Sequence, residues 1–314
     1  MSRLTRRART PRRRLLALGA SALVLAGLAA PATSSAQIVG IGDQNPATFS
    51  DPAFRSLGVN RSRFFPPWDA ITKDPARLDA WLNAARAAGI QPLVAFNHSA
   101  SQTCPSRRCT PPSVRAYTRA FRAFRTRYPW VKVYSPWNEV NSPTQPTGKN
   151  PRRAAEYYNA VRANCRGCTI VAADIQDLSA RTMTRYLRTF KRYAKGSPRL
   201  WGLHNYSDTN RFRTSGTKTM LRLVRGDVWL TETGGIYKRL GSGSQLRPSS
   251  SRQKRATEYM FRLAKQNRRR IKRLYIYQWR VTNPNDRFDA GLVNADGSPR
   301  PAFSVVRANK RLFR

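Results

Sequence analysis

Two glutamates stand directly after short apolar runs that have the composition of buried strands. Glu139 ends the run 131–139, Val-Lys-Val-Tyr-Ser-Pro-Trp-Asn-Glu, and Glu232 follows the run 228–231, Val-Trp-Leu-Thr. A carboxylate at the mouth of a buried strand is costly to remove from water, so its presence indicates a function. Two carboxylates that face each other can supply a proton donor and a nucleophile, the pair needed to hydrolyse a glycosidic bond. The alternative is structural: Glu139 caps a loop and Glu232 pairs with an arginine.

Further polar and aromatic side chains fall where other strands are expected to end, and they include both histidines of the chain. We treat seven of them as candidate substrate-binding residues: Arg63, His98, Trp137, Asn138, His204, Tyr206 and Trp279. Asn138 can bond a sugar hydroxyl more tightly in the transition state, which lowers the barrier. Trp279 can offer an apolar floor to the C–H face of a sugar. For the aromatic members and His98, the alternative is a structural place in the core.

Physical chemistry assigns the two glutamates different roles. Carboxylates about 5 Å apart repel each other, so one keeps its proton near neutral pH and can act as the acid. Arg63 and Tyr206 can hold Glu232 ionised, as the nucleophile, through a charge and a hydrogen bond. Glu139, expected in a less cationic place against Trp137, would then hold the proton.

The rest of the sequence alternates short β-rich runs with amphipathic helical patterns, which is typical of α/β architecture with parallel strands. Leu78, Trp81, Leu82 and Ala85, for example, share one helix face, and Gly89 is the expected stop. Eight strand–helix units in about 275 residues fit a single (β/α)8 TIM barrel, whose typical size is about 250 residues. The eight expected strands are 38–41, 59–64, 92–96, 131–135, 169–173, 200–203, 228–231 and 274–277.

In such a barrel the reacting groups sit at the C-terminal ends of the strands, which is where Glu139 and Glu232 fall. Asp174 and Asp177 follow the fifth expected strand, and we interpret them as loop caps. The alternative fold is a doubly wound open sheet, which needs a glycine-rich phosphate turn after its first strand. The segment 40–44, Gly-Ile-Gly-Asp-Gln, is followed by neither a third glycine nor a helical pattern, so the barrel is favoured.

From about residue 38 to about 309, the order of motifs resembles that of the retaining glycoside hydrolases of the barrel clan GH-A, of the family 5 and 39 type. Trp137-Asn138-Glu139 is similar to that clan's fourth-strand motif, in which the Glu is the acid/base and the Asn binds the sugar's 2-hydroxyl. Thr231-Glu232-Thr233 is similar to its seventh-strand nucleophile. The resemblance also implies sugar-site roles for Arg63, His98, His204, Tyr206 and Trp279.

The first 36 residues have the pattern of a signal peptide or N-terminal anchor. An arginine-rich start precedes the apolar stretch 15–30, and small residues stand before Gln37. The apolar stretch is short for a membrane span, and no later segment reaches membrane length. Cleavage would leave 51 basic against 16 acidic residues, a formal charge of +35. Such a charge favours anionic partners, although an arginine-biased composition on solvated helix faces is an equal alternative.

The four cysteines form two close pairs, Cys104 with Cys109 and Cys165 with Cys168. In an exported protein, two local disulfides are the favoured interpretation. The segment Cys165-Arg-Gly-Cys168 leaves a redox motif or half a zinc site as alternatives. A redox pair would open a helix, whereas this one stands at an expected helix exit. A zinc site would need four ligands in one place.

The sequence therefore predicts a secreted retaining O-glycoside hydrolase, with Glu139 as acid/base and Glu232 as nucleophile, on one barrel at 37–314. We expect no metal and no organic cofactor. The expected partner is a carbohydrate, with an anionic glycan as one option. We expect no specific nucleic acid, because no helix-turn-helix, RNA-recognition or zinc-finger pattern is present. We expect a monomer, extracellular or attached to the cell envelope. The alternatives are a non-catalytic, strongly basic carbohydrate- or cell-wall-binding barrel and, more remotely, a polysaccharide lyase.

Overall fold

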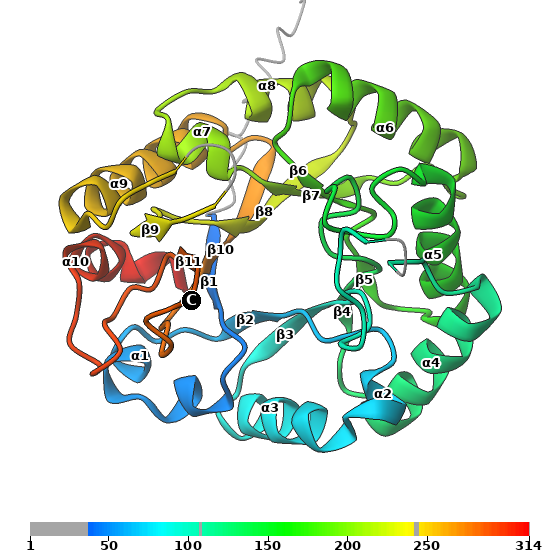
Figure 1. Cartoon of the computed structure of the whole chain (residues 1–314), viewed down its shortest axis with the longest axis horizontal. Helices are drawn as coiled ribbons and strands as arrows, with labels where there is room; N and C mark the ends of the chain where they lie inside the picture. The colour runs from blue at the N-terminus through cyan, green and yellow to red at the C-terminus, as the bar shows by residue number, and fades with distance from the viewer. Residues whose placement is uncertain (1–36, 107–108, 242–244, 314) are drawn as a thin grey trace, which may run out of the picture. The chain divides into compact units, whose positions relative to one another are not determined.

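The computed structural model describes residues 37–106, 109–241 and 245–313, and the segment expected to be a signal peptide lies outside them. Figure 1 shows the strands of this part in a ring with the helices outside it. The strands of the ring are β1 (Ile38–Gly42), β2 (Arg61–Phe64), β3 (Gln91–Ala95), β4 (Val133–Ser135), β5 (Thr169–Ile170), β6 (Asp174–Gln176), β7 (Leu200–His204), β8 (Asp227–Thr233) and β10 (Ile271–Tyr277).

The sheet closes on itself because β5 and β6 are two parts of one extended stretch, residues 169–176. The hydrogen-bonded order is β5-β4-β3-β2-β1-β10-β8-β7-β6, and every pairing in it is parallel. Between the two parts, the Val171 N–H donates to Tyr134 and the Ala172 N–H donates to Leu200, so the stretch joins both neighbours. The described residues therefore form a (β/α)8 barrel with the eight expected strands, and the open doubly wound sheet is excluded.

Helices surround the ring, and the longer ones bury an apolar face. They are α1 (Pro52–Ser56), α2 (Ala70–Lys73), α3 (Pro75–Ala87), α4 (Val114–Arg127), α5 (Pro151–Asn164), α6 (Ala180–Tyr193), α7 (Tyr206–Asn210), α8 (Ser215–Leu223), α9 (Ser250–Gln266) and α10 (Pro301–Ala308). The expected face of α3 is buried, and Gly89 follows it with φ +68°, a conformation that favours glycine. Helix α4 begins at the Ser113 cap, whose hydroxyl accepts the Ala116 N–H.

A small apolar cluster separates the upper mouth of the barrel from its base. Leu93, Val133, Val171, Trp229 and Tyr275 are all buried and pack on one another from five stretches of the ring. Side chains alternate between the two faces of a strand, so the residue two positions after each of these also points inward. Those residues form the next layer, nearer the mouth. The functional candidates therefore lie on a packed floor and not in an open pore.

Four short elements complete the chain, namely the 3-10 helices η1 (Pro46–Ser50) and η2 (Lys310–Phe313) and the strands β9 (Lys238–Arg239) and β11 (Phe288–Asp289). The strands β9 and β11 pair antiparallel outside the ring. Both expected disulfides are present, Cys104–Cys109 and Cys165–Cys168. Among the described residues, no helix is long and apolar enough to cross a membrane.

Candidate active site

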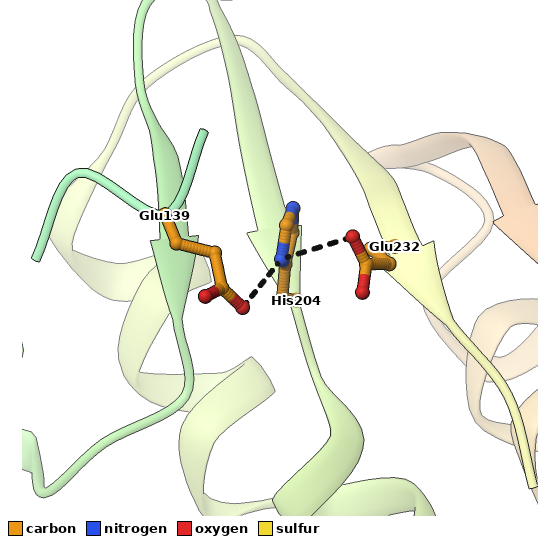
Figure 2. Close-up of side chains that lie close together, drawn as sticks. All are labelled: Glu139, His204 and Glu232. Atoms are coloured by element: carbon orange, nitrogen blue, oxygen red, sulfur yellow. Dashed lines mark hydrogen bonds and ion pairs between the residues drawn. The ribbon is translucent and has the colours of Figure 1, made fainter. Parts of the chain in front are cut away.

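The two glutamates face each other across His204 at the C-terminal mouth of the barrel. Glu139 follows β4, Glu232 lies near the end of β8, and His204 ends β7 between them (Figure 2). One carboxylate oxygen of each glutamate and one ring nitrogen of His204 all lie within 4.8 Å of one another. Residues 93 positions apart in the sequence thus form one site, because parallel strands end at the same edge.

The backbone around Glu139 is held in an uncommon conformation. Glu139 has φ +45°, in the left-handed region that costs a non-glycine residue about 1–3 kcal/mol. Hydrogen bonds fix the residues on both sides: the Asn138 N–H donates to Phe96 at 2.7 Å and the Val140 N–H donates to Asp174 at 2.9 Å. Neighbouring strands therefore impose the turn that directs the Glu139 side chain into the mouth.

Glu232 is held by a cation and a hydroxyl. Arg63 Nη1 donates to Glu232 Oε2 at 2.7 Å, and the Tyr206 hydroxyl donates to Oε1 at 3.1 Å. Arg63 is only 1% exposed, so little water screens its charge. The structure therefore brings the two residues expected beside Glu232 into contact with it, one on each carboxylate oxygen.

The same guanidinium orders Asn138. Arg63 Nη2 donates to Asn138 Oδ1 at 2.6 Å and to Asp174 Oδ2 at 3.1 Å. Because the amide oxygen of Asn138 is already an acceptor, this side chain offers a ligand only its N–H donors. The charge of three carboxylates, those of Asp174, Glu232 and Glu139, raises the pKa of Arg63 against the opposing effect of burial.

His204 is the second cation of the site. Its Nδ1 lies 3.1 Å from Glu139 Oε1 and 3.8 Å from Glu232 Oε2. Burial lowers the pKa of His204, but the charge of Glu232, the nearby carboxylate of Asp174 and the hydrogen bond with Glu139 outweigh it and raise the pKa to about 9. A raised pKa favours the protonated imidazole at neutral pH, with Nδ1–H directed at Glu139. Its Nε2 lies 3.3 Å from Arg63 Nη2 and 3.7 Å from Asp174 Oδ2.

This arrangement bears on the expected protonation of Glu139. Burial raises the pKa of Glu139, but the hydrogen bond from His204, the charge of His204 and a 2.8 Å bond from Gln176 Nε2 outweigh it and lower the pKa. The lowered pKa opposes the expectation that Glu139 holds the proton. Glu232 still has the closer cation, with Arg63 at 2.7 Å, whereas Glu139 contacts the imidazole at 3.1 Å. The lowered pKa of Glu139 and the raised pKa of His204 both favour the proton on His204 in the free protein.

Two contributors were missed because the fifth strand is longer than expected. The expected strand ended at residue 173, which assigned Asp174 and Gln176 to a loop, whereas both belong to β6. Asn141 fixes Gln176 by exchanging two hydrogen bonds with its backbone. Asp177, in contrast, is a loop cap as expected, since its carboxylate accepts the N–H groups of Ser207 and Asp208.

A pocket of about 530 Å³ opens above the two glutamates. Its aromatic wall is made by Tyr206, Tyr277 and Phe288, with the Phe288 ring 5.5 Å from Tyr206 and 6.3 Å from Tyr277, centroid to centroid. Tyr277 ends β10 and was also missed, although it stands two residues after the inward-facing Tyr275. An apolar wall beside a few convergent polar groups is typical of a ligand site.

Five of the seven candidate binding residues do not line this pocket. Arg63 and Asn138 are buried behind it and contact each other, and the other three lie elsewhere. Trp137 and Trp279 are 0% exposed, so neither can offer a ring face to a sugar. The expectation that they contact substrate is wrong, because both lie in the core. Trp137 stacks on Tyr157, and Trp279 packs against helices α1 and α10 through Phe54 and Phe303. His98 does not line the pocket either; its Nδ1 lies 3.0 Å from the Ser99 carbonyl oxygen.

Solved structures of glycosidase barrels resemble the chain. A family 39 glycoside hydrolase from Bacteroides cellulosilyticus WH2 superposes with a TM-score of 0.58 at 15% identity, over 88% of this chain and 63% of that one. A monomeric β-xylosidase from Caulobacter crescentus CB15 gives 0.61 at 13% identity, over 87% and 67%. A GH10 endoxylanase retrieved from a sugarcane soil metagenome gives 0.61 at 11% identity, over 88% and 97%.

The chain shares their fold. It spans less than two thirds of the length of the family 39 enzyme, and at these identities the likeness concerns the barrel alone. No protein-family model matches the sequence, and no curated protein matches it. The activity must therefore be argued from the residues at the mouth of the barrel.

Glu139, His204 and Glu232 also have the spacing of a metal-ligand set. Two features favour an acid–base site instead. Arg63 already supplies positive charge to Glu232 from 2.7 Å, and a metal ion would lie beside that charge. His204 Nδ1, which faces both glutamates, carries the proton donated to Glu139, and a metal would have to displace it.

Proposed function

We propose that the chain is a secreted retaining O-glycoside hydrolase that acts on a poly- or oligosaccharide. The observation that carries this proposal is the approach of the two glutamates, whose nearest oxygens lie within 4.8 Å. Retaining enzymes hold their carboxyl groups about 5–5.5 Å apart, whereas inverting enzymes need about 6.5–9.5 Å to admit a water. The glycosidase barrels that share the fold support the same class of reaction.

In the first step, Glu232 is the nucleophile. Its carboxylate attacks the anomeric carbon, the bond to the leaving oxygen breaks, and a glycosyl ester of Glu232 forms. The leaving oxygen takes a proton from Glu139. Arg63 and Tyr206 support this role because they keep Glu232 ionised and fix both of its oxygens. The two hydrogen bonds, one on each oxygen, also orient the attacking carboxylate, so less entropy is lost in ordering it during the reaction.

The proton for Glu139 comes from His204 in this account. His204 Nδ1–H donates to Glu139 Oε1 at 3.1 Å, so the proton can cross to the carboxylate as the leaving oxygen draws it away. In the second step, Glu139 accepts a proton from water and passes it back to His204, the water oxygen bonds to the anomeric carbon, and the ester to Glu232 breaks. The sugar leaves with its original anomeric configuration, and the site regains its starting charges.

Three finer points belong to the same proposal. The two disulfides and the expected signal peptide support an extracellular or cell-envelope location. The formal charge of +35 after cleavage supports an anionic glycan as partner. We further propose that the enzyme works as a monomer, because one barrel supplies both carboxylates.

A substrate panel tests the proposal. We expect the purified protein to release reducing ends from at least one neutral or acidic glycan, or nitrophenol from a 4-nitrophenyl glycoside of xylose, glucose, mannose or glucuronic acid. Proton NMR of the first product should show the anomeric configuration of the substrate. Inversion would exclude Glu232 as a nucleophile, and glycan binding with no product release would favour the non-catalytic binding barrel.

The role of Glu139 has its own signature. A leaving group that needs no proton, such as 2,4-dinitrophenolate, should leave Glu139→Gln nearly as fast as the wild type in the first step, which kcat/KM reports, while natural glycans should show a large loss of kcat/KM. The second step is slowed for both kinds of substrate, because it uses Glu139 as base. Lys132→Gln is a suitable control, because this exposed side chain lies directly before β4, at the end of the strand opposite to Glu139, and outside the pocket. Equal losses on both kinds of substrate would contradict an acid/base role for Glu139.

A further inference from the structure

Asp174 is buried at the centre of the site without touching the pocket. It begins β6, it is 0% exposed, and it does not line the cavity above the glutamates. One oxygen, Oδ2, lies 3.1 Å from Arg63 Nη2 and 3.7 Å from His204 Nε2. A carboxylate is removed from water at high cost, and here two cationic side chains compensate it.

Each of these two cations contacts one glutamate with its other side. Arg63 Nη1 donates to Glu232 at 2.7 Å, and His204 Nδ1 donates to Glu139 at 3.1 Å. Asp174 Oδ2 therefore lies beside both cations, whose own nitrogens, Arg63 Nη2 and His204 Nε2, are 3.3 Å apart. Arg63 holds Glu232, and His204 holds Glu139 and also lies 3.8 Å from Glu232. Rotation of either cation away from Asp174 would move the glutamate that it holds.

The neighbouring strand leaves room for this carboxylate. Gly202 of β7 stands opposite Asp174 in the parallel register. A Cβ atom at Gly202 would lie 2.0 Å from Asp174 Oδ1, closer than any side chain permits. Glycine weakens a strand interior, so its presence here fits a need for space beside Asp174.

We propose that Asp174 is the positioning residue of this site: its buried carboxylate fixes Arg63 and His204 together and so sets the places of Glu232 and Glu139. The effect on turnover rests on the proposed function, whereas the effect on His204 does not. Asp174 never contacts the sugar in this account, so its loss should lower kcat and leave KM within about twofold.

The charges around His204 predict what the loss of Asp174 would do. The groups that face its ring are Glu139, Asp174 and Glu232 on the acidic side and Arg63 on the basic side. Tyr206 lies beside them as a neutral hydroxyl. Removal of one of three carboxylates from this set weakens the attraction for the proton of His204 and leaves the repulsion from Arg63 unchanged.

The test is an NMR titration of the imidazole nitrogens in ¹⁵N-histidine-labelled protein. The chain has only two histidines, so His204 is read directly and His98 serves as an internal control. In the wild type we expect His204 to stay protonated beyond pH 8. In Asp174→Asn, which keeps the shape and removes the charge, we expect its midpoint to fall by about one pH unit or more. The midpoint of His98 should not move.

Asp51→Asn is the matched control. It removes a carboxylate from another ion pair, with Arg280 at 2.8 Å, away from the pocket. Both variants lose stability, so a merely structural role for Asp174 would make them alike. We expect only Asp174→Asn to move the His204 midpoint and to lower kcat, by about tenfold or more, on the 4-nitrophenyl glycosides.

The outcomes separate the two proposals. An unchanged His204 midpoint in Asp174→Asn, or an ordinary midpoint near 6.5 in the wild type, would overturn the positioning role. The wild-type measurement needs no variant to fold. If the midpoint falls as expected but the wild type cleaves no glycan, the contacts of Asp174 stand and the proposed hydrolase does not. A rise in KM of Asp174→Asn with kcat unchanged would also contradict the proposal.

Discussion

Arg63 Nη1 lies 2.7 Å from Glu232 Oε2, and both side chains are almost fully removed from water. The same guanidinium reaches Asn138 and Asp174, so one arginine joins residues of four different strands or strand ends. A planar fork with several donors can make these contacts at once, whereas a lysine ammonium is a single point charge. The arginine is therefore as specific a requirement of the site as the glutamates.

The first prediction concerns Arg63→Lys. We expect kcat/KM to fall by about 100-fold or more, because one charge remains but the fork that orders Glu232 and Asn138 is lost. The measurement is steady-state kinetics on the best substrate of the panel. Arg61→Lys, an inward arginine at the other end of the same strand, is the control. Equal effects of the two substitutions would mean that the barrel needs arginines for packing and not Arg63 for the site.

The second prediction concerns stability against pH. His204 has a pKa of about 9 in the folded protein, above its usual 6.5, so the folded state binds this proton more tightly than the unfolded state. Its contribution is fully present below pH 6.5 and is lost as the pH rises to about 9. Burial raises the pKa of Asp177 to about 7, so its contribution to stability is present below about pH 4 and is lost as the pH rises to about 7. This interval lies below the one in which the contribution of His204 is lost.

Urea unfolding between pH 7 and 9 therefore isolates His204. We expect the free energy of unfolding to fall across this interval, and the fall to be smaller in His204→Gln. At the acidic end, Asp174 has a pKa of about 2, below its usual 3.8, so its contribution is present above pH 4 and is lost as the pH falls through about 2. A wild type whose stability is the same at pH 7 and pH 9 would contradict the charge state assigned to His204.

The third prediction separates Trp279 from Tyr277. Trp279→Ala should cost about 3–5 kcal/mol of unfolding free energy, because a fully buried indole leaves a cavity among Phe54 and Phe303. Its KM should stay near the wild-type value at a temperature where the variant is folded. Tyr277→Ala should instead raise KM, since this ring lines the pocket. The reverse pattern of KM changes would show that Trp279 binds the sugar after all.

The fourth prediction concerns the disulfides. Replacement of Cys104 and Cys109 by serine should lower the free energy of unfolding by about 2 kcal/mol, as should replacement of Cys165 and Cys168, because each bond closes a very short loop. Activity should persist in both variants, since none of the four residues lines the pocket. Thermal unfolding with and without a reductant provides the measurement. A reductant that shifts the unfolding of the wild type no more than that of the variants would contradict these bonds.

The sequence was most informative where the periodicity of its apolar residues defined the strands and polar residues followed at the strand ends. Eight apolar runs separated by amphipathic helices have few arrangements other than a barrel, and the ends of parallel strands meet at one edge. The order of the strands alone, without their side-chain conformations, therefore places Glu139, Glu232 and Arg63 together.

The sequence predictions that the structure corrects each failed for a local reason. A strand boundary placed three residues early put Asp174 and Gln176 in a loop, although a buried carboxylate beside an arginine is a strand-end feature. Trp279 was preferred because tryptophan is a good sugar platform, whereas the inward alternation that begins at Tyr275 selects Tyr277. The contact of His204 with Glu139 depends on a side-chain orientation across two strands, which no spacing in the sequence reports.

The central claim is that Glu232 is the nucleophile of a double displacement, and azide rescue of Glu232→Ala tests it most directly. Removal of the carboxylate should lower hydrolysis of a 4-nitrophenyl glycoside by at least about 1,000-fold. Azide should then restore part of the rate by attacking the anomeric carbon from the vacated side, and the product should be a glycosyl azide of inverted configuration. A variant that keeps a near-wild-type rate, or that yields no glycosyl azide, would contradict the account.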